Sequence, residues 1–314
     1  NNKKNMRYKL LPQMKAHDKL THTWLPYIMY FHQPNFQSKV INLDNFGLRF
    51  NNENDFKKNN FEKNTIFKNN KKKSHIVIGG STAFGVGASK DENTITGKLS
   101  KQSNYNYYNL GGRAFSGFQE IILFQSLVNK IKALDEVTII SGANDLYLMT
   151  QSDNFNKILG PLFFNDSLNK LNNPNLIRSY ISSLINSKKI KNEINTIISK
   201  DEKKIILIDI IKRNIYLWSL LSKSMNIKVT FMLQPVANWI NREIINEEAI
   251  IFSELDDSKN SINFNNIFSL ENYEFYTKEL NICCNNYDIN FVDTNKLDTI
   301  TNSKKWIFID RVHL

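Results

Sequence analysis

The stretch His75-Ile76-Val77-Ile78-Gly79-Gly80-Ser81-Thr82-Ala83-Phe84-Gly85 decides the fold of this 314-residue chain. Its opening residues form a short apolar run that ends in glycine, which predicts a strand buried on both faces of a sheet. A serine follows the two glycines, at the point where a strand of a parallel sheet gives way to a helix. Side chains at this point lie at the carboxyl edge of the sheet, where α/β proteins bind their ligands.

Strands and helices alternate from this stretch to the end of the chain. Further strands are predicted over 105–110, 137–140, 228–233 and 289–293, and helices over 93–100, 118–131, 204–225 and 271–285. Such alternation predicts parallel βαβ units. We therefore expect an α/β fold, a flavodoxin-like three-layer α/β/α sandwich whose five-stranded parallel sheet has the order 2-1-3-4-5.

The first 73 residues lie outside this alternation. Residues 40–50 alternate apolar and polar side chains, which predicts a strand or a hairpin with its turn at Asp44-Asn45. Residues 51–73 are charged and rich in asparagine, and this composition is typical of a linker or exposed loop. We therefore divide the chain into an N-terminal extension or cap with its linker over 1–73, and an α/β domain over 74–314.

The composition narrows the classes of partner. The net charge of +11 comes from lysines that cluster beside asparagine-rich stretches and are not interleaved with aromatic residues, which favours a solvated surface over a nucleic-acid site. The chain shows no signal peptide and no apolar run long enough for a membrane span, so we expect a cytoplasmic protein without an integral membrane segment. The two cysteines, Cys283 and Cys284, are adjacent and lack metal-type spacing, so we expect no metal. The oligomeric state is not indicated.

Two further segments carry residues suited to acyl chemistry. Ser141-Gly142-Ala143-Asn144-Asp145 ends the third strand, where the amide of Asn144 could donate a hydrogen bond to an oxyanion. Asp310-Arg311-Val312-His313 follows the fifth strand. An aspartate three residues before a histidine can orient the imidazole that takes a proton from a serine such as Ser81.

Together these segments resemble the SGNH (GDSL-like) hydrolase superfamily, over residues 74 to the end. Gly80-Ser81 matches the block that holds the nucleophile, residues 142–145 match the third block, and residues 310–313 match the last. The resemblance implies a catalytic triad of Ser81, His313 and Asp310. It also implies an oxyanion hole that uses Ser81 and Asn144, and it implies no cofactor.

The resemblance is imperfect in three places. In the second block, over Asn109-Leu110-Gly111-Gly112-Arg113-Ala114, the alignment puts Ala114 where the family has an oxyanion glycine, with Gly111 or Gly112 as the fallback. Gly80 replaces the aspartate that usually precedes the nucleophile. The last helix that the family has after the histidine is missing, so we expect the C-terminal helix to lie outside this sequence. Pieces of residues 1–73 resemble N-terminal extensions of some bacterial members.

These residues predict an esterase that removes a small acyl group from a sugar, glycan or other metabolite. An acyltransferase of the same fold, or an inactive binding protein that has kept the fold, is the alternative. A flavodoxin-like nucleotide binder is disfavoured because no phosphate-binding motif is present. The histidines outside the last block have no partner pattern and are interpreted as surface or structural residues: His17, His22, His32 and His75.

Overall fold

The computed structural model describes residues 6–57, 64–149, 158, 160, 162–164, 199–256 and 261–314. Its main sheet has five parallel strands, which are β3 (Ser74–Gly79), β4 (Asn106–Gly111), β5 (Leu134–Ser141), β6 (Lys228–Leu233) and β7 (Asn290–Asp293). Their spatial order is β4-β3-β5-β6-β7. Counted along this domain the order is 2-1-3-4-5, so the predicted flavodoxin-like sheet is confirmed.

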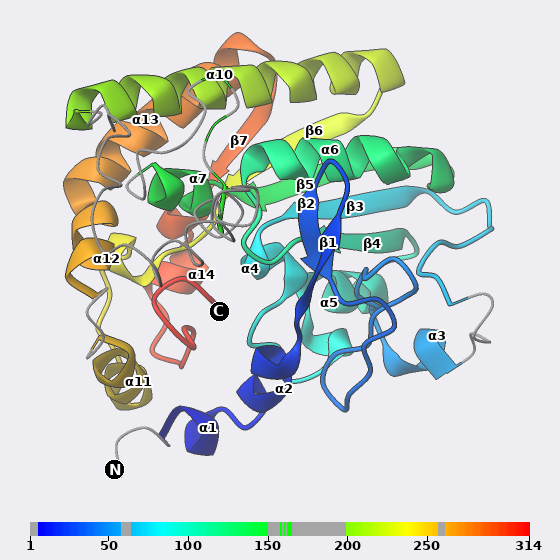
Figure 1. Ribbon diagram of the computed structural model, residues 1–314, viewed down its shortest axis with the longest axis horizontal. Helices are drawn as coiled ribbons and strands as arrows, with labels where there is room; N and C mark the ends of the chain where they lie inside the picture. The colour runs from blue at the N-terminus through cyan, green and yellow to red at the C-terminus, as the bar shows by residue number, and fades with distance from the viewer. Residues whose placement is uncertain are drawn as a thin grey trace, which may run out of the picture.

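Helices cover both faces of the sheet (Figure 1). One layer holds α6 (Gly117–Leu127), α10 (Lys200–Met225) and α13 (Leu270–Asn286), and the other holds α4 (Ser81–Phe84) and α5 (Ile95–Gln102). Helix α10 begins four residues before the predicted start. The hydroxyl of Ser199 caps it by accepting the N–H of Glu202, which satisfies a donor of the first turn.

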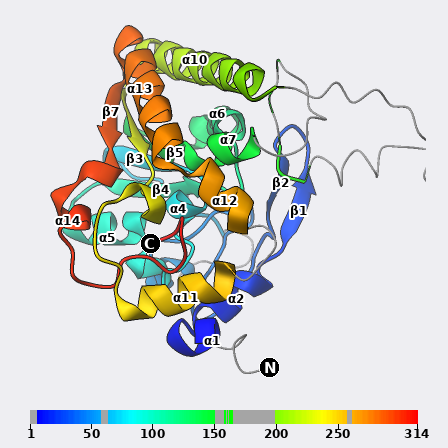
Figure 2. The same ribbon diagram turned by 90° about the vertical axis from the view of Figure 1, so that its left-hand side faces the viewer.

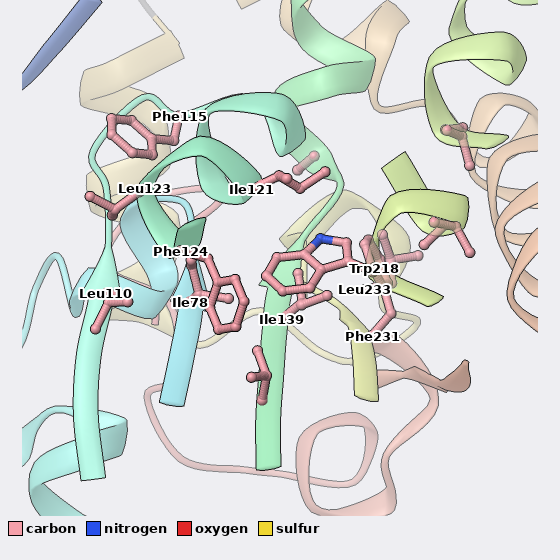
Figure 3. Close-up of a cluster of buried hydrophobic side chains, with 14 of the residues drawn as sticks. Ile78, Leu110, Phe115, Ile121, Leu123, Phe124, Ile139, Trp218, Phe231 and Leu233 are labelled. Atoms are coloured by element: carbon pink, nitrogen blue, oxygen red, sulfur yellow. The ribbon is translucent and has the colours of Figure 1, made fainter. Parts of the chain in front are cut away.

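Along the central strands, successive side chains pack alternately against the two helical layers. In β3, Ile76 and Ile78 face the layer of α6 and α10, whereas Val77 packs with Ala83 of α4. Between the sheet and the first layer, Phe124 of α6 and Trp218 of α10 meet with ring centroids 5.0 Å apart (Figure 3). Because both faces of β3 are buried, its sequence is a continuous apolar run and does not alternate with polar residues.

The first part of the chain forms its own small elements: α1 (Met6–Leu10), α2 (Met14–Lys19), a two-stranded hairpin of β1 (His22–Leu25) and β2 (Met29–His32), and α3 (Glu53–Lys57). The sequence did not predict the hairpin. Tyr27 in its turn and Met29, the first residue of β2, both have φ 70°, a conformation normally signalled by glycine or asparagine. Residues 40–50 form only isolated antiparallel bridges, such as Leu43 with Arg49, around the expected turn.

A buried ion pair joins this N-terminal region to the α/β domain. Nε of Arg49 donates to Asp91 at 2.8 Å, and the two side chains are 0% and 3% exposed. Nη1 also donates to the carbonyls of Phe84 and Gly85, and Nη2 donates to that of Val40. Each buried charge is thus paired and hydrogen-bonded, which is the condition under which burying it is tolerable.

Short helices complete the fold: α7 (Ala143–Leu148), α11 (Asn246–Asp256), α12 (Ser261–Ile267) and α14 (Asp298–Thr301). Helix α1 packs beside α11, although the two are far apart in sequence (Figure 2). Cys283 and Cys284 are buried on α13 with free thiols. Among the described residues, none of the helices combines the length and apolar character that a membrane span needs.

Candidate active site

Ser81 stands at the carboxyl end of β3, as the first residue of α4. Gly79 makes this turn possible, because a Cβ added there would lie 2.0 Å from the carbonyl oxygen of Ile140 in β5, and its φ of +152° suits glycine alone. The neighbouring strands therefore approach closely where the chain leaves the sheet, and the Ser81 hydroxyl lies at the sheet edge.

Ser81, His313 and Asp310 form one chain of hydrogen bonds. Nε2 of His313 lies 2.6 Å from Oγ of Ser81, and Nδ1 of His313 lies 2.7 Å from a carboxylate oxygen of Asp310. Because an ionised carboxylate only accepts, Nδ1 carries the proton and Nε2 is left to accept from the serine hydroxyl. A serine whose proton is held by an oriented imidazole is arranged as an activated nucleophile.

The Asp310 carboxylate also organises the loop that carries the histidine. It accepts the main-chain N–H groups of Val312 and His313, both at 2.9 Å. Burial alone would raise the pKa of Asp310, but the charge of His313 and these hydrogen bonds outweigh it and hold the pKa below its usual value. The carboxyl group is therefore ionised at neutral pH and able to stabilise an imidazolium.

Of the candidate oxyanion donors in the loop after β4, one main-chain N–H has no acceptor among the described residues. The N–H of Gly111 donates to the side chain of Asn109, and that of Gly112 donates to the carbonyl of Gly79. Both fallback donors are thus occupied. By contrast, the N–H groups of Ala114 and Ser81 find no acceptor among the residues that the structure describes. These two N–H groups remain available to a ligand.

The N-terminal hairpin holds Ala114 in place. Ala114 has φ +60°, a left-handed conformation that costs a non-glycine residue about 1–2 kcal/mol. The hydroxyl of Tyr30 donates to the carbonyl of Ala114, and Nε2 of His32 accepts the N–H of Arg113 at 3.1 Å. His32 donates from Nδ1 to the carbonyl of Gly47. This histidine is structural, as expected.

Asn144 lies at the same edge, in the first turn of α7. Its Nδ2 donates one hydrogen to the carbonyl of Phe115 at 2.8 Å, which leaves the second amide hydrogen free. A Cβ added to Gly80 would lie 2.8 Å from this Nδ2. The aspartate that the family resembled in sequence usually carries at this position therefore has no room here without moving the Asn144 amide.

A cavity of about 510 Å³ opens over these residues. The N-terminal region, the loops after β3, β4 and β5, helix α12 and the C-terminal loop all contribute to its walls. Its lining includes Arg7, Met14, His17, Asp18, His22, Ser81, Val86, Arg113, Ala114, Ala143, Asn144, Tyr147, Phe163, Phe164, Phe264, Phe268, Asp310, Val312 and His313. The volume is typical of a small-molecule site.

The sequence did not place the N-terminal histidines in this cavity. His17 and His22 line it, but neither has a spacing relation to Ser81 that could have shown this. Burial lowers the pKa of His17 to about 3 and that of His22 to about 4, so both rings are neutral at physiological pH. No group of three or more metal-binding side chains occurs in the described part of the chain.

Two carboxyl groups lie behind the site. Asp145 accepts the N–H of Gly117, the first residue of α6, at 3.1 Å, and Glu120 accepts the hydroxyl of Ser141 at 2.6 Å. Burial, and then the charge of Asp145, raise the pKa of Glu120 well above its usual value. Burial raises the pKa of Asp145 to about 6, against the opposing Gly117 hydrogen bond and the charge of Arg213.

No protein-family model matches the chain, and no curated protein matches it. Some solved structures do. A variant of esterase AlinE4 has a TM-score of 0.35 with 12% identity, covering 77% of this chain and 88% of its own. The acetyl xylan esterase AlAXEase has a TM-score of 0.35 with 13% identity, over 77% and 91%. A Bacteroides fragilis protein proposed to be an acylhydrolase has a TM-score of 0.35 with 16% identity, over 77% and 78%.

These neighbours carry names from the enzyme class that the sequence resemblance implied. TM-scores of this size lend no weight to a fold or an activity, however. The assignment of the fold rests on the chain's own sheet order, and the chemistry of the site rests on the distances between its own residues.

Replacing Asp145 with asparagine should change how stability depends on pH. A carboxyl group whose folded pKa is raised from 3.8 to about 6 stabilises the protein at low pH, and this contribution is lost as pH rises between these values. Asparagine does not titrate. The unfolding free energy of Asp145→Asn minus that of the wild type should therefore rise by about 1–3 kcal/mol as the pH increases from 4 to 7. Urea denaturation at several pH values measures this, and parallel profiles would contradict it.

Proposed function

We propose that this protein is a serine hydrolase that cleaves small acyl esters. The observation that carries the proposal is the hydrogen-bonded chain from Ser81 through His313 to Asp310 at the carboxyl edge of a parallel sheet. In this proposal Ser81 is the nucleophile, His313 the general base and then the general acid, and Asp310 the group that orients and stabilises the imidazolium.

The reaction proceeds in two steps, acylation of Ser81 and then hydrolysis of the acyl-serine. Oγ of Ser81 attacks the acyl carbon while its proton passes to Nε2 of His313. The carbon–oxygen bond to the alcohol then breaks, and His313 returns the proton to the departing alkoxide. Water then attacks the acyl carbon of the acyl-serine while its proton passes to the same nitrogen. The bond between the acyl carbon and Oγ breaks, the carboxylic acid leaves, and His313 returns the proton to Oγ, which restores the Ser81 hydroxyl.

The N–H groups of Ser81 and Ala114 and the free amide hydrogen of Asn144 are suited to hold the oxyanion that forms in each step. Two features support this part of the proposal: the two main-chain donors have no acceptor within the described residues, and Asn144 is fixed by its bond to Phe115. Donors that are already in place stabilise developing charge without reorganisation. The Ala114 donor depends on the N-terminal hairpin, so the hairpin is part of the machinery in this proposal.

The volume of the cavity is large enough for a small ester. The aromatic side chains that line the cavity offer a face for a sugar ring or an apolar acyl group. We therefore propose that the substrate is an acylated sugar or another acylated metabolite.

The double variant of Ser81 and His313 tests the proposal by its kinetics. A hydroxyl is a poor nucleophile until its proton has an acceptor, so the two residues act as a unit. Ser81→Ala, His313→Ala and the double variant should each lower kcat for 4-nitrophenyl acetate by a similar factor, on the order of a thousandfold or more. Ser253→Ala, which changes an exposed serine on α11, is the matched control and should retain full activity. Losses that multiply in the double variant would contradict a shared proton transfer.

Gly80→Ala tests the role of Asn144. The backbone at Gly80, with φ −80° and ψ −153°, accommodates alanine, so the only obstacle to a Cβ is the Asn144 amide. The variant should fold normally but lose on the order of tenfold to a hundredfold in kcat, because the amide must turn away from the oxyanion. In an Asn144→Ala background, which should itself lose on the order of a hundredfold or more, the change at Gly80 should have no further effect. Independent, multiplying losses would rule out this explanation.

A further inference from the structure

Arg113 places a positive charge in the wall of the cavity, next in sequence to the Ala114 donor. Its Nη1 donates to the carbonyl of Leu20 at 2.7 Å, which fixes the side chain against the N-terminal region. Within the parts of the chain that the structure describes, no carboxylate lies at ion-pair distance from this guanidinium. Burial lowers the pKa of Arg113, with the charge of Asp18 opposing, but an arginine stays protonated at neutral pH.

The other charges that line the cavity are already paired. The carboxylate of Asp18 takes hydrogen bonds from Arg7 at 2.6 Å and from the hydroxyl of Tyr8 at 2.8 Å. The carboxylate of Asp310 is saturated by His313 and the main chain. Arg113 is thus the cation of this cavity whose charge is least compensated, and a half-buried guanidinium of this kind favours an anionic partner.

The neighbouring histidines are neutral and add no positive charge beside Arg113. His17 and His22 line the same cavity, and burial keeps both of them neutral, as described above. They contribute polar surface without adding a second positive charge. Because Arg7 is paired with Asp18, Arg113 is the cation of the described lining that has no carboxylate partner, and its planar fork of donors is the geometry that binds a carboxylate or phosphate group.

Aromatic side chains make up much of the remaining lining. Tyr147 stacks on Phe163 with ring centroids 5.7 Å apart, and also on Phe268 of the same cavity at 6.4 Å. Phe163 and Phe164 are 6.5 Å apart, and Phe164 reaches His22 at 5.9 Å. This aromatic wall carries no charge and suits the uncharged part of a ligand.

We propose that the natural substrate is an anionic ester, whose carboxylate or phosphate group binds Arg113 while its uncharged part lies on the aromatic wall. This proposal rests on the proposed esterase function and narrows its substrate class. A substrate anion would meet a cation already fixed by Leu20, so binding would order few additional atoms.

Matched esters test the proposal. Three acetyl esters differ in one substituent of the phenol: 3-acetoxybenzamide is neutral, 3-acetoxybenzoate carries a carboxylate, and 3-acetoxyphenyl phosphate carries a phosphate. We expect kcat/KM to be higher for at least one anionic ester than for the amide. Arg113→Gln should lower this anionic-to-neutral ratio by on the order of tenfold to a hundredfold, and Arg113→Lys should lower it less, because lysine keeps the charge but loses the fork.

Lys98→Gln is the control, because it removes the same charge from an exposed position on α5, outside the cavity, and should leave the ratio unchanged. The comparison of the two anionic esters distinguishes a carboxylate from a phosphate as the preferred group. A ratio near one in the wild type, or an equal ratio in wild type and Arg113→Gln, would overturn the proposal while the esterase function stands.

A binding measurement separates this proposal from the esterase function itself. Calorimetry on the Ser81→Ala protein needs no turnover, and it compares the phenols 3-hydroxybenzoate, 3-hydroxyphenyl phosphate and 3-hydroxybenzamide. We expect an anionic phenol to bind more tightly than the amide, and Arg113→Gln to remove the difference. Equal binding of all three would overturn the anion site, whereas selective binding without any Ser81-dependent hydrolysis would support the site and contradict the esterase.

Discussion

The hydrogen bond between Ser81 and His313 joins two residues that are 232 positions apart, at opposite ends of the α/β domain. The parallel sheet makes this bond possible, because the carboxyl ends of its strands meet at one edge. The bond also depends on Asp310, whose carboxylate holds the imidazole and the main chain around it together. A further hydrogen bond fixes the loop that carries His313, since the hydroxyl of Thr82 donates to the carbonyl of Val312 at 3.3 Å.

The N-terminal region completes the site from the other side. Its attachment is built on the buried pair of Arg49 and Asp91. The hairpin contacts the loop after β4. There Tyr30 donates to the carbonyl of the left-handed Ala114, and His32 accepts the N–H of the preceding Arg113. A strained backbone persists only where surrounding contacts impose it. The hairpin therefore offers a physical reason why alanine can occupy a position where the family resembled in sequence has glycine.

The sheet order and the candidate triad were accessible from the sequence because both depend on local signals. Apolar runs that end in glycine mark β3 and its neighbours, and the spacing of Asp310 and His313 is short enough to recognise in one segment. The alignment favoured Ala114 and kept Gly111 or Gly112 as the fallback, but the sequence could not show which of these N–H groups the fold leaves without an acceptor. The positions of His17, His22 and Arg113 in the cavity also depend on long-range packing, and the hairpin lacks the turn residues that would have revealed it.

The most direct measurement of the central claim is covalent labelling with a fluorophosphonate, which reacts with a serine only when a base and an oxyanion site activate it. Digestion and mass spectrometry then identify the modified residue. We predict one adduct, on Ser81, which is absent from Ser81→Ala and forms far more slowly in His313→Ala. Failure of the wild type to label, equal labelling of the wild type and Ser81→Ala, or an adduct on another serine, would contradict the assignment of Ser81 as the nucleophile.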